Sequence, residues 1–187
     1  MNETTKLYAY RRQHGYERYL RGHGIDIGCG HDCLSPALFP GITAVDPYDR
    51  AQGDAHTCAT IADGQYDFVY SSHCLEHLHN PWQAFAHWIR ICKPRGYLVT
   101  AVPHEIFYEK CRWPSRFNRD HRWSWTLEWP SNLPRSIHVP TFVAQFMASV
   151  TLVQAQTVLE HFDFTRFKED QTLGAGICQI EFVVQKH

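Results

Sequence analysis

The stretch Gly24-Ile25-Asp26-Ile27-Gly28-Cys29-Gly30 decides the fold of this 187-residue chain. A short apolar strand opens there into a turn with two glycines, which let the backbone approach a ligand closely. Eighteen positions after Gly28, Asp46 closes a second apolar run. A carboxylate at the end of a second strand is typical of sites that hold the two hydroxyls of a ribose. The two features together predict a site for a ribose-containing ligand at the glycine turn.

Three further motifs continue this pattern. They are Gly53-Asp54-Ala55, the strand-like run Tyr66-Asp67-Phe68-Val69-Tyr70-Ser71-Ser72, and Leu75-Glu76-His77-Leu78. With them, residues 22–104 resemble the class I S-adenosylmethionine-dependent methyltransferases, closest to the small-molecule branch with a Leu-Glu-His-Leu turn after its fourth strand. One position departs from the family, since Asp32 stands where a third glycine is common. The rest of the chain resembles the family only in strand order.

The resemblance implies S-adenosylmethionine as the cofactor and gives each motif a role. The glycine turn and the acid before it would face the methionine moiety, and the acid that ends the second strand would bind the ribose. The Gly-Asp-Ala motif would meet the adenine edge, and the residues after the fourth strand would lie near the donor methyl group. In that order, the predicted cofactor-binding residues are Asp26, Gly28 and Gly30; Asp46; Asp54 and Ala55; Ser72 and His73.

Composition favours one globular domain over residues 1–187, with an N-terminal helical cap (1–23) and an acceptor-side insertion (105–140). Hydrophobic residues make up 44% and charged residues 20%, which excludes a disordered chain. No apolar run is long enough to span a bilayer, and no secretion signal is visible. Seven cysteines without a CxxC pair favour reduced thiols and a cytoplasmic location.

Strand and helix patterns alternate along the chain. The strand candidates are 24–28, 42–46, a short segment leading to Asp54, 66–71 and 96–102, with a terminal hairpin from 150–153 and 177–184. Asn80 and Pro81 are typical of a helix start, and the apolar face predicted after them is Trp82, Phe85, Ala86, Ile89 and Cys92. The chain therefore predicts an α/β fold, a Rossmann-like, doubly wound, mostly parallel seven-stranded sheet with a C-terminal antiparallel hairpin.

A competing motif overlaps the fourth strand. His73-Cys74-Leu75-Glu76-His77 matches the H-x-x-E-H pattern of zinc peptidases, in which both histidines share one helical face. A strand enters this motif and a new helix begins at Asn80-Pro81, so little room is left for the helix that zinc chemistry requires. We assign no residue to a metal, and a zinc hydrolase remains an alternative.

The segment from Lys110 to Trp125 interleaves basic and aromatic residues, and only Asp120 opposes its positive charge. It follows the fifth strand and so lies beyond the carboxyl ends of the parallel strands, where open α/β sheets bind ligands. Guanidinium groups suit phosphate or carboxylate, and tryptophan faces suit a base or a sugar. The predicted acceptor-binding residues are Arg112, Arg116, Arg119 and Arg122. The alternative is a basic surface loop whose aromatic residues cover the core.

Methyl transfer to a small acceptor, anionic or sugar-like, is the function that these features predict. An oxygen acceptor would also use a base, and His104 and His121 are the histidines best placed for proton transfer. Nucleic acid is disfavoured as a partner because no RNA-binding module is visible and the isoelectric point is about 6.9. The other open interpretation is a catalytically silent protein that binds S-adenosylmethionine and serves as a partner.

Overall fold

Residues 2–187 are described by the computed structural model. The α-helices are α1 (Glu3–Lys6), α2 (Tyr8–Gln13), α3 (Pro81–Ile91) and α4 (Val139–Ala144). The strands are β1 (Gly22–Ile27), β2 (Ile42–Tyr48), β3 (Tyr66–Ser72), β4 (Cys92–Pro103), β5 (Ser124–Thr126), β6 (Ser136–His138), β7 (Val150–Val158) and β8 (Gln179–Lys186). Short 3-10 turns cover Tyr16–Arg18, Pro36–Leu38, Leu75–His77, Phe164–Arg166 and Gln171–Leu173.

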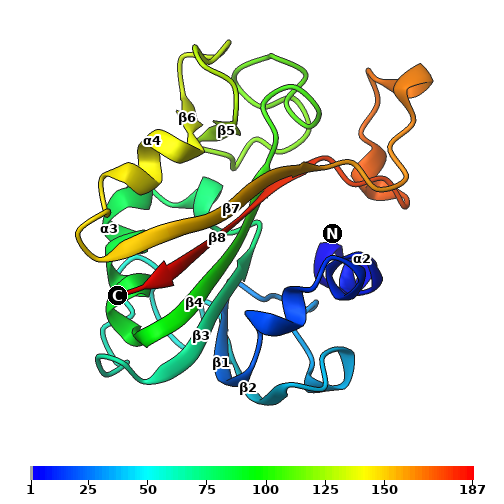
Figure 1. Ribbon diagram of the computed structural model, residues 1–187. Helices are drawn as coiled ribbons and strands as arrows, with labels where there is room; N and C mark the ends of the chain where they lie inside the picture. Colours follow the sequence, from blue (N-terminus) through cyan, green and yellow to red (C-terminus); the bar gives the residue numbers. More distant parts are fainter. Residues whose placement is uncertain (1) are drawn as a thin grey trace.

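One six-stranded sheet has the order β2-β1-β3-β4-β8-β7 (Figure 1). β1 pairs in parallel with β2 and with β3, and β3 pairs in parallel with β4. β8 lies between β4 and β7 and is antiparallel to both. The predicted Rossmann-like fold with a terminal antiparallel hairpin is confirmed.

The number of strands differs from the prediction of seven. In the described chain, the segment that leads to Asp54 forms turns, so β2 is an edge strand. This segment is rich in polar residues and contains Gly53, which has positive φ. Such a stretch offers too few β-branched and aromatic side chains to form a further strand.

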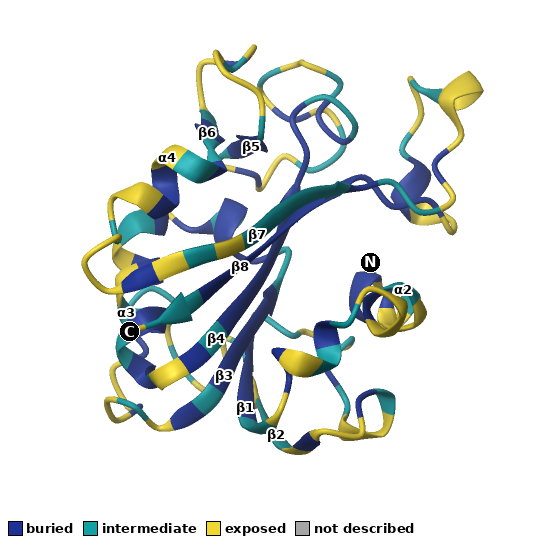
Figure 2. Cartoon of the chain, viewed as in Figure 1, coloured by how far each residue is buried: buried dark blue, intermediate teal, exposed yellow. Residues whose placement is uncertain are grey.

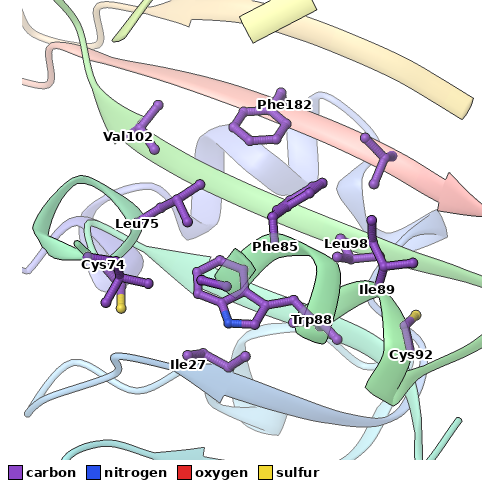
Figure 3. Packing of buried hydrophobic residues seen from close by; sticks show 14 of the residues in the cluster. Ile27, Cys74, Leu75, Phe85, Trp88, Ile89, Cys92, Leu98, Val102 and Phe182 are labelled. Atoms are coloured by element: carbon purple, nitrogen blue, oxygen red, sulfur yellow. The ribbon is translucent and has the colours of Figure 1, made fainter. Parts of the chain in front are cut away.

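Both faces of the sheet are covered (Figure 1). The larger core lies between the sheet and α3, where Phe85 and Trp88 pack against Leu98 and Phe182 (Figure 3). On the opposite face, aromatic residues of the N-terminal segment such as Tyr16 pack with residues of β3 and β4. Figure 2 shows the central strands buried along most of their length.

Helix α3 begins as its sequence predicts. The Asn80 side chain accepts a 3.1 Å hydrogen bond from the backbone nitrogen of Gln83, and Pro81 is the first helical residue. The buried face differs from the prediction, because Ala86 is exposed and Trp88 is fully buried. The Trp88 indole reaches across to donate a 2.8 Å hydrogen bond to the carbonyl of Ala55. This contact orients the helix and turns Ala86 toward solvent.

The N-terminal cap is a chain of short helices. Leu7 has non-helical backbone angles between α1 and α2, and Gly15 has φ +72° before the next turn. Arg11, on α2, is fully buried and forms a 2.7 Å ion pair with Glu181 of β8. The cap is thereby fixed over the sheet.

Two long loops lie beyond one end of the sheet (Figure 1). The segment 104–138 contains β5 and β6, which form a small parallel pair. A second excursion, 159–178, joins β7 to β8. Within residues 2–187, no helix has the length and apolar character that crossing a bilayer requires.

Candidate functional site

A pocket of about 190 Å³ lies at the carboxyl end of β1, directly at the glycine turn. It contains five of the predicted cofactor-binding residues together with residues of the N-terminal cap. The lining residues are Glu3, Thr4, Asp26, Gly28, Cys29, Gly30, His31, Asp32, Ser72 and His73. Ligand sites commonly measure about 300–1,000 Å³. The pocket therefore has room for one end of a cofactor, and the rest would extend beyond it.

Gly28 and Gly30 both have positive φ, at +78° and +54°. A Cβ atom on Gly28 would lie only 2.6 Å from Sγ of Cys74, so this position excludes any larger residue for reasons of packing. A Cβ atom on Gly30 would meet nothing within 4 Å and would stand in open space beside the pocket. The first glycine closes the turn against the core, and the second leaves the backbone uncovered for a ligand.

Asp26 presents an unused acceptor to this pocket. Its Oδ2 accepts a 2.7 Å hydrogen bond from the backbone nitrogen of Leu34, whereas its buried Oδ1 has no partner among the described residues. Burial raises the pKa of Asp26 to about 7, although the bond from Leu34 opposes this shift. A buried oxygen without a partner fits the ammonium group of an amino-acid moiety, so these residues fit the methionine end of S-adenosylmethionine.

Asp32, which replaces the family's third glycine, holds the N-terminal cap in place. Its carboxylate accepts hydrogen bonds from the backbone nitrogens of Thr4 and Thr5, at 2.8 Å and 3.2 Å. Helix α1 therefore forms one wall of the pocket. This role of the cap, and of Glu3 and Thr4, was not predicted from the sequence.

His73 also lines the pocket and links it to a buried acid. Its Nε2 lies 2.8 Å from Oε1 of Gln179, and its Nδ1 lies 3.4 Å from Oε1 of Glu76. Burial alone would lower the pKa of His73, but the nearby Glu76 raises it to about 9. Burial would also favour neutral Glu76, but His73, with His77 and His121, holds the Glu76 pKa at about 2. The pair therefore carries opposite charges at neutral pH.

Asp46, the predicted ribose acid, is not at this pocket. β2 continues to Tyr48, so Asp46 lies opposite Ile25 and not beside the glycine turn. Both of its oxygens are used, by His23 at 2.9 Å and by Tyr66 at 2.8 Å. The geometry therefore does not support the assignment of Asp46 to the ribose.

Asp49 is a second acid near the glycine turn, although, like Asp46, it does not line the pocket. It follows the last residue of β2, and the carbonyl of the preceding Tyr48 accepts a 2.7 Å hydrogen bond from the nitrogen of Gly28. After burial and the charge of Asp26, the charge of Asp49 contributes to raising the pKa of the Cys29 thiol. In the sequence, the signal that could have pointed to Asp49 is its place directly after the last residue of β2.

Asp54 and Ala55 lie outside the pocket in the loop after β2. Oδ1 of Asp54 accepts hydrogen bonds from the backbone nitrogen and Nδ1 of His56, and the Ala55 carbonyl is taken by Trp88. The Asp54 side chain is 60% exposed. Their predicted contact with adenine stays a prediction.

A second, open hollow of about 660 Å³ lies in the predicted acceptor-side insertion. Arg112, Arg116 and Arg119 line it together with Trp113, whereas Arg122 does not. None of these arginines forms an ion pair with an acid of residues 2–187. Trp125 is fully buried in the core. The segment from Lys110 to Trp125 therefore contributes some residues to a ligand-sized hollow and others to core packing.

The two candidate bases have different surroundings. Nδ1 of His121 lies 2.7 Å from Oε1 of Glu109, and its Nε2 is buried without a partner in the described chain. Both ring nitrogens of His104 are bonded, to Thr157 and to the backbone nitrogen of Ile106, and burial lowers its pKa to about 4. Neither histidine lines either cavity. The geometry favours His121 because its Nε2 is free, whereas both nitrogens of His104 are bonded within the chain.

The H-x-x-E-H motif does not form the helix of a zinc peptidase. His73 follows β3 with φ +53°, and Leu75–His77 is a single 3-10 turn. The prediction of a strand and a loop around this motif is confirmed. His73 and His77 therefore do not share the helical face that two ligands at i and i+4 require.

Comparisons with known proteins agree on one fold. Residues 7–152 match the model of a family described as a methyltransferase domain. No curated protein gives a significant sequence match. A proposed S-adenosylmethionine-dependent methyltransferase from Listeria monocytogenes aligns with a TM-score of 0.66 and 14% identity, over 100% of this chain and 99% of that one.

Two further solved structures illustrate the range of proteins with this architecture. The N-methyltransferase NodS from Bradyrhizobium japonicum WM9, in complex with S-adenosyl-L-homocysteine, has a TM-score of 0.58 at 11% identity, over 97% of this chain and 86% of its own. The [4+2]-cyclase SpnF has a TM-score of 0.57 at 16% identity, over 99% of this chain and 81% of its own. Such low identities establish the fold alone.

Proposed function

We infer the function from the premise that this chain belongs to the methyltransferase domain family whose model its residues 7–152 match. Membership confirms the resemblance drawn from the motifs, and S-adenosylmethionine is the cofactor that it implies. The protein transfers the methyl group of that cofactor to a small acceptor of anionic or sugar-like character. One observation supports this proposal above all: the glycine-turn pocket contains a buried, unpartnered oxygen of Asp26.

The cofactor end of the site consists of Asp26, Gly28, Gly30, Ser72 and His73. Asp26 binds the ammonium group, and the uncovered backbone at Gly30 receives the methionine chain. Asp49 replaces Asp46 as the ribose acid in this assignment, because it follows β2 beside the turn. Asp54 and Ala55 remain assigned to the adenine edge. The bound cofactor supplies an activated methyl group, and the chain has to align the acceptor and exclude water.

The acceptor end is assigned to the arginine-lined hollow. Its guanidinium groups are exposed and form no ion pair with an acid of residues 2–187, so an anionic acceptor would supply the missing charge. Trp113 offers an aromatic surface in the same hollow, which suits a ring. Arg122 does not line the hollow and keeps only the status of a prediction.

His121 is assigned the role of holding the acceptor or its proton. Glu109 orients its ring through Nδ1 and leaves Nε2 free for a ligand.

The seven cysteines of the described chain are free thiols, which supports a cytoplasmic location.

Calorimetry with S-adenosylhomocysteine, followed by a transfer assay with labelled S-adenosylmethionine, tests the proposal. The assay panel contains anionic phenols, sugar phosphates and neutral sugars. Combined replacement of Arg112, Arg116 and Arg119 by Gln should weaken use of an anionic acceptor and leave S-adenosylhomocysteine affinity unchanged. Arg122→Gln is the matched control. Cofactor binding without turnover of any acceptor would instead indicate a silent binding protein.

A further inference from the structure

Glu76 contacts two histidines besides His73, and together they form a compact cluster. The ligand atoms of Glu76, His77 and His121 all lie within 4.8 Å of one another. Oε1 of Glu76 is 3.8 Å from Nε2 of His77 and 3.9 Å from Nε2 of His121. The backbone carbonyl of Glu76 also accepts hydrogen bonds from the nitrogens of Arg122 and Trp123, which fixes the acceptor-side loop onto this turn.

Both histidines direct Nε2 toward the carboxylate. Nδ1 of His77 lies 3.2 Å from the backbone carbonyl of Asp120, and Nδ1 of His121 lies 2.7 Å from Oε1 of Glu109. Carbonyl and carboxylate oxygens are acceptors only, so each Nδ1 carries the proton that it donates. The remaining Nε2 of each ring is then an unprotonated nitrogen in the neutral tautomer, as metal ligation requires.

The cluster contains buried polar atoms that lack a hydrogen bond in residues 2–187, although His73 lies 3.4 Å from Oε1 of Glu76 as an ion-pair partner. Both carboxylate oxygens of Glu76 and Nε2 of His121 lack hydrogen-bond partners, and both side chains are fully buried. Unpartnered buried polar atoms are costly and uncommon in native proteins. His77 is 31% exposed, which leaves a route from solvent to the three ligand atoms.

We propose that Glu76, His77 and His121 bind a divalent transition-metal ion. Two imidazoles and one carboxylate suit zinc and similar ions better than magnesium or calcium, which prefer oxygen ligands. Bonds of about 2.0–2.2 Å separate ligand atoms by roughly 3–3.5 Å, so a small contraction of this cluster completes the site. Glu109 then acts behind His121 as the carboxylate that orients a ligating histidine.

This site differs from the zinc-peptidase alternative, because His121 replaces His73 and Glu76 is a ligand. The proposed ion also specifies how His121 would act on the acceptor. Nε2 of His121 would bind the ion, and an oxygen of the acceptor would bind to a coordination position of the ion that no protein atom occupies. That role rests on the proposed function. The ion site itself does not.

Zinc binding to the full-length chain tests the site. Chelator-stripped protein is titrated with ZnCl₂ by calorimetry, with MgCl₂ as the comparison ion, and Co²⁺ loading is followed by absorption spectroscopy. One zinc per chain is expected, with affinity lowered at least about tenfold in His77→Gln and about 10–100-fold in Glu109→Gln. His14→Ala, which removes an exposed histidine elsewhere, is the matched control.

The outcomes separate this site from the proposed function. Calorimetry with S-adenosylhomocysteine is run on the same stripped samples and variants, where unchanged affinity is expected. Zinc affinity that is equal in His77→Gln and in the His14→Ala control overturns the metal site and leaves methyl transfer standing. Glu76→Gln is a further variant. If it fails to fold, the His77→Gln variant still tests the site, because His77 is partly exposed.

Discussion

Asp26 and Leu34 are joined by a 2.7 Å hydrogen bond that satisfies only one of the two buried carboxylate oxygens. Burial raises the pKa of Asp26 to about 7 in the folded protein. In the unfolded chain an aspartate ionises near pH 3.9. Between these two values the folded protein therefore binds more protons than the unfolded chain, so its stability falls as the pH rises.

The first prediction concerns this pH window. Asp26 should contribute a decrease in the free energy of unfolding of the cofactor-free protein from about pH 4 to pH 7, by up to about 1.4 kcal/mol per pH unit. His104, whose pKa burial lowers to about 4, contributes with the opposite sign over part of this range, so the difference between variants is what matters. Asp26→Asn should remove that part of the slope. Urea unfolding of both proteins across this range measures the difference. Parallel curves for the two proteins would show that Asp26 does not titrate in this way.

The second prediction separates the two glycines of the turn. Gly28→Ala forces a Cβ atom against Cys74 at positive φ, so it should destabilise the fold by at least about 1–2 kcal/mol. Gly30→Ala meets no neighbour and should cost stability only through its backbone angle, yet it should weaken S-adenosylhomocysteine binding. Thermal unfolding and calorimetry measure the two effects. Full cofactor affinity in Gly30→Ala would remove this residue from the site.

The third prediction compares the two acids of the second strand region. Loss of a charged hydrogen-bond acceptor costs about 1.5–3 kcal/mol of binding, so Asp49→Ala should lower S-adenosylhomocysteine affinity about 10–100-fold. Asp46→Ala should leave that affinity nearly unchanged, because its carboxylate binds His23 and Tyr66. Calorimetry of the two variants decides between them. The reverse result would restore Asp46 as the ribose acid.

The fourth prediction concerns the ion pair between the N-terminal cap and β8. Arg11 and Glu181 are both fully buried, and Gln179 bridges Glu181 to His73 through two hydrogen bonds. Arg11→Met leaves a buried charge without a partner and should cost about 3–5 kcal/mol of stability. Arg12→Met is the control, since Arg12 is half exposed and should change stability by less than about 1 kcal/mol.

Denaturant unfolding of the single and double variants measures the coupling of this pair. The double variant Arg11→Met with Glu181→Leu should regain much of the loss, because no isolated charge remains buried. Losses that simply add in the double variant would show that the two side chains are not coupled.

Local sequence patterns were sufficient for the main elements of the fold. The glycine turn, the start of α3 at Asn80 and the strand before Leu75 depend on neighbouring residues, and each was placed correctly. The end of β2 was placed at Asp46, where the apolar run closes. An edge strand tolerates proline, so the strand continues to Tyr48. The longer strand is the reason that we propose Asp49, and not Asp46, as the ribose acid.

Contacts between distant segments could not be predicted in the same way. His77 and His121 are 44 positions apart, and their rings meet only because the acceptor-side loop folds back onto the turn at Glu76. The closure of the cofactor pocket by Thr4 likewise depends on Asp32, 28 positions away. The spacing of residues within one segment carries no information about contacts between segments that are far apart in the sequence. The zinc-peptidase alternative would pair His73 with His77, whereas the ring that lies against His77 is that of His121.

The last prediction concerns His121 and its orienting acid. His121→Ala should lower kcat on an oxygen acceptor by about 10²–10⁴-fold, whether its Nε2 takes a proton or holds an ion. Glu109→Gln should have a smaller effect, because the ring keeps its place but loses a charged partner. His104→Ala is the control, since both ring nitrogens of His104 are bonded within the chain and its loss should alter stability more than kcat. S-adenosylhomocysteine affinity should stay unchanged in all three variants, which shows that the cofactor pocket is intact. Where Nε2 of His121 holds an ion that takes part in the reaction, addition of zinc to chelator-treated protein restores turnover to the unaltered chain but not to His121→Ala, whereas a His121 that only takes a proton gives turnover that is independent of zinc. Undiminished turnover in His121→Ala would exclude this residue from the reaction and place the acceptor elsewhere in the arginine-lined hollow.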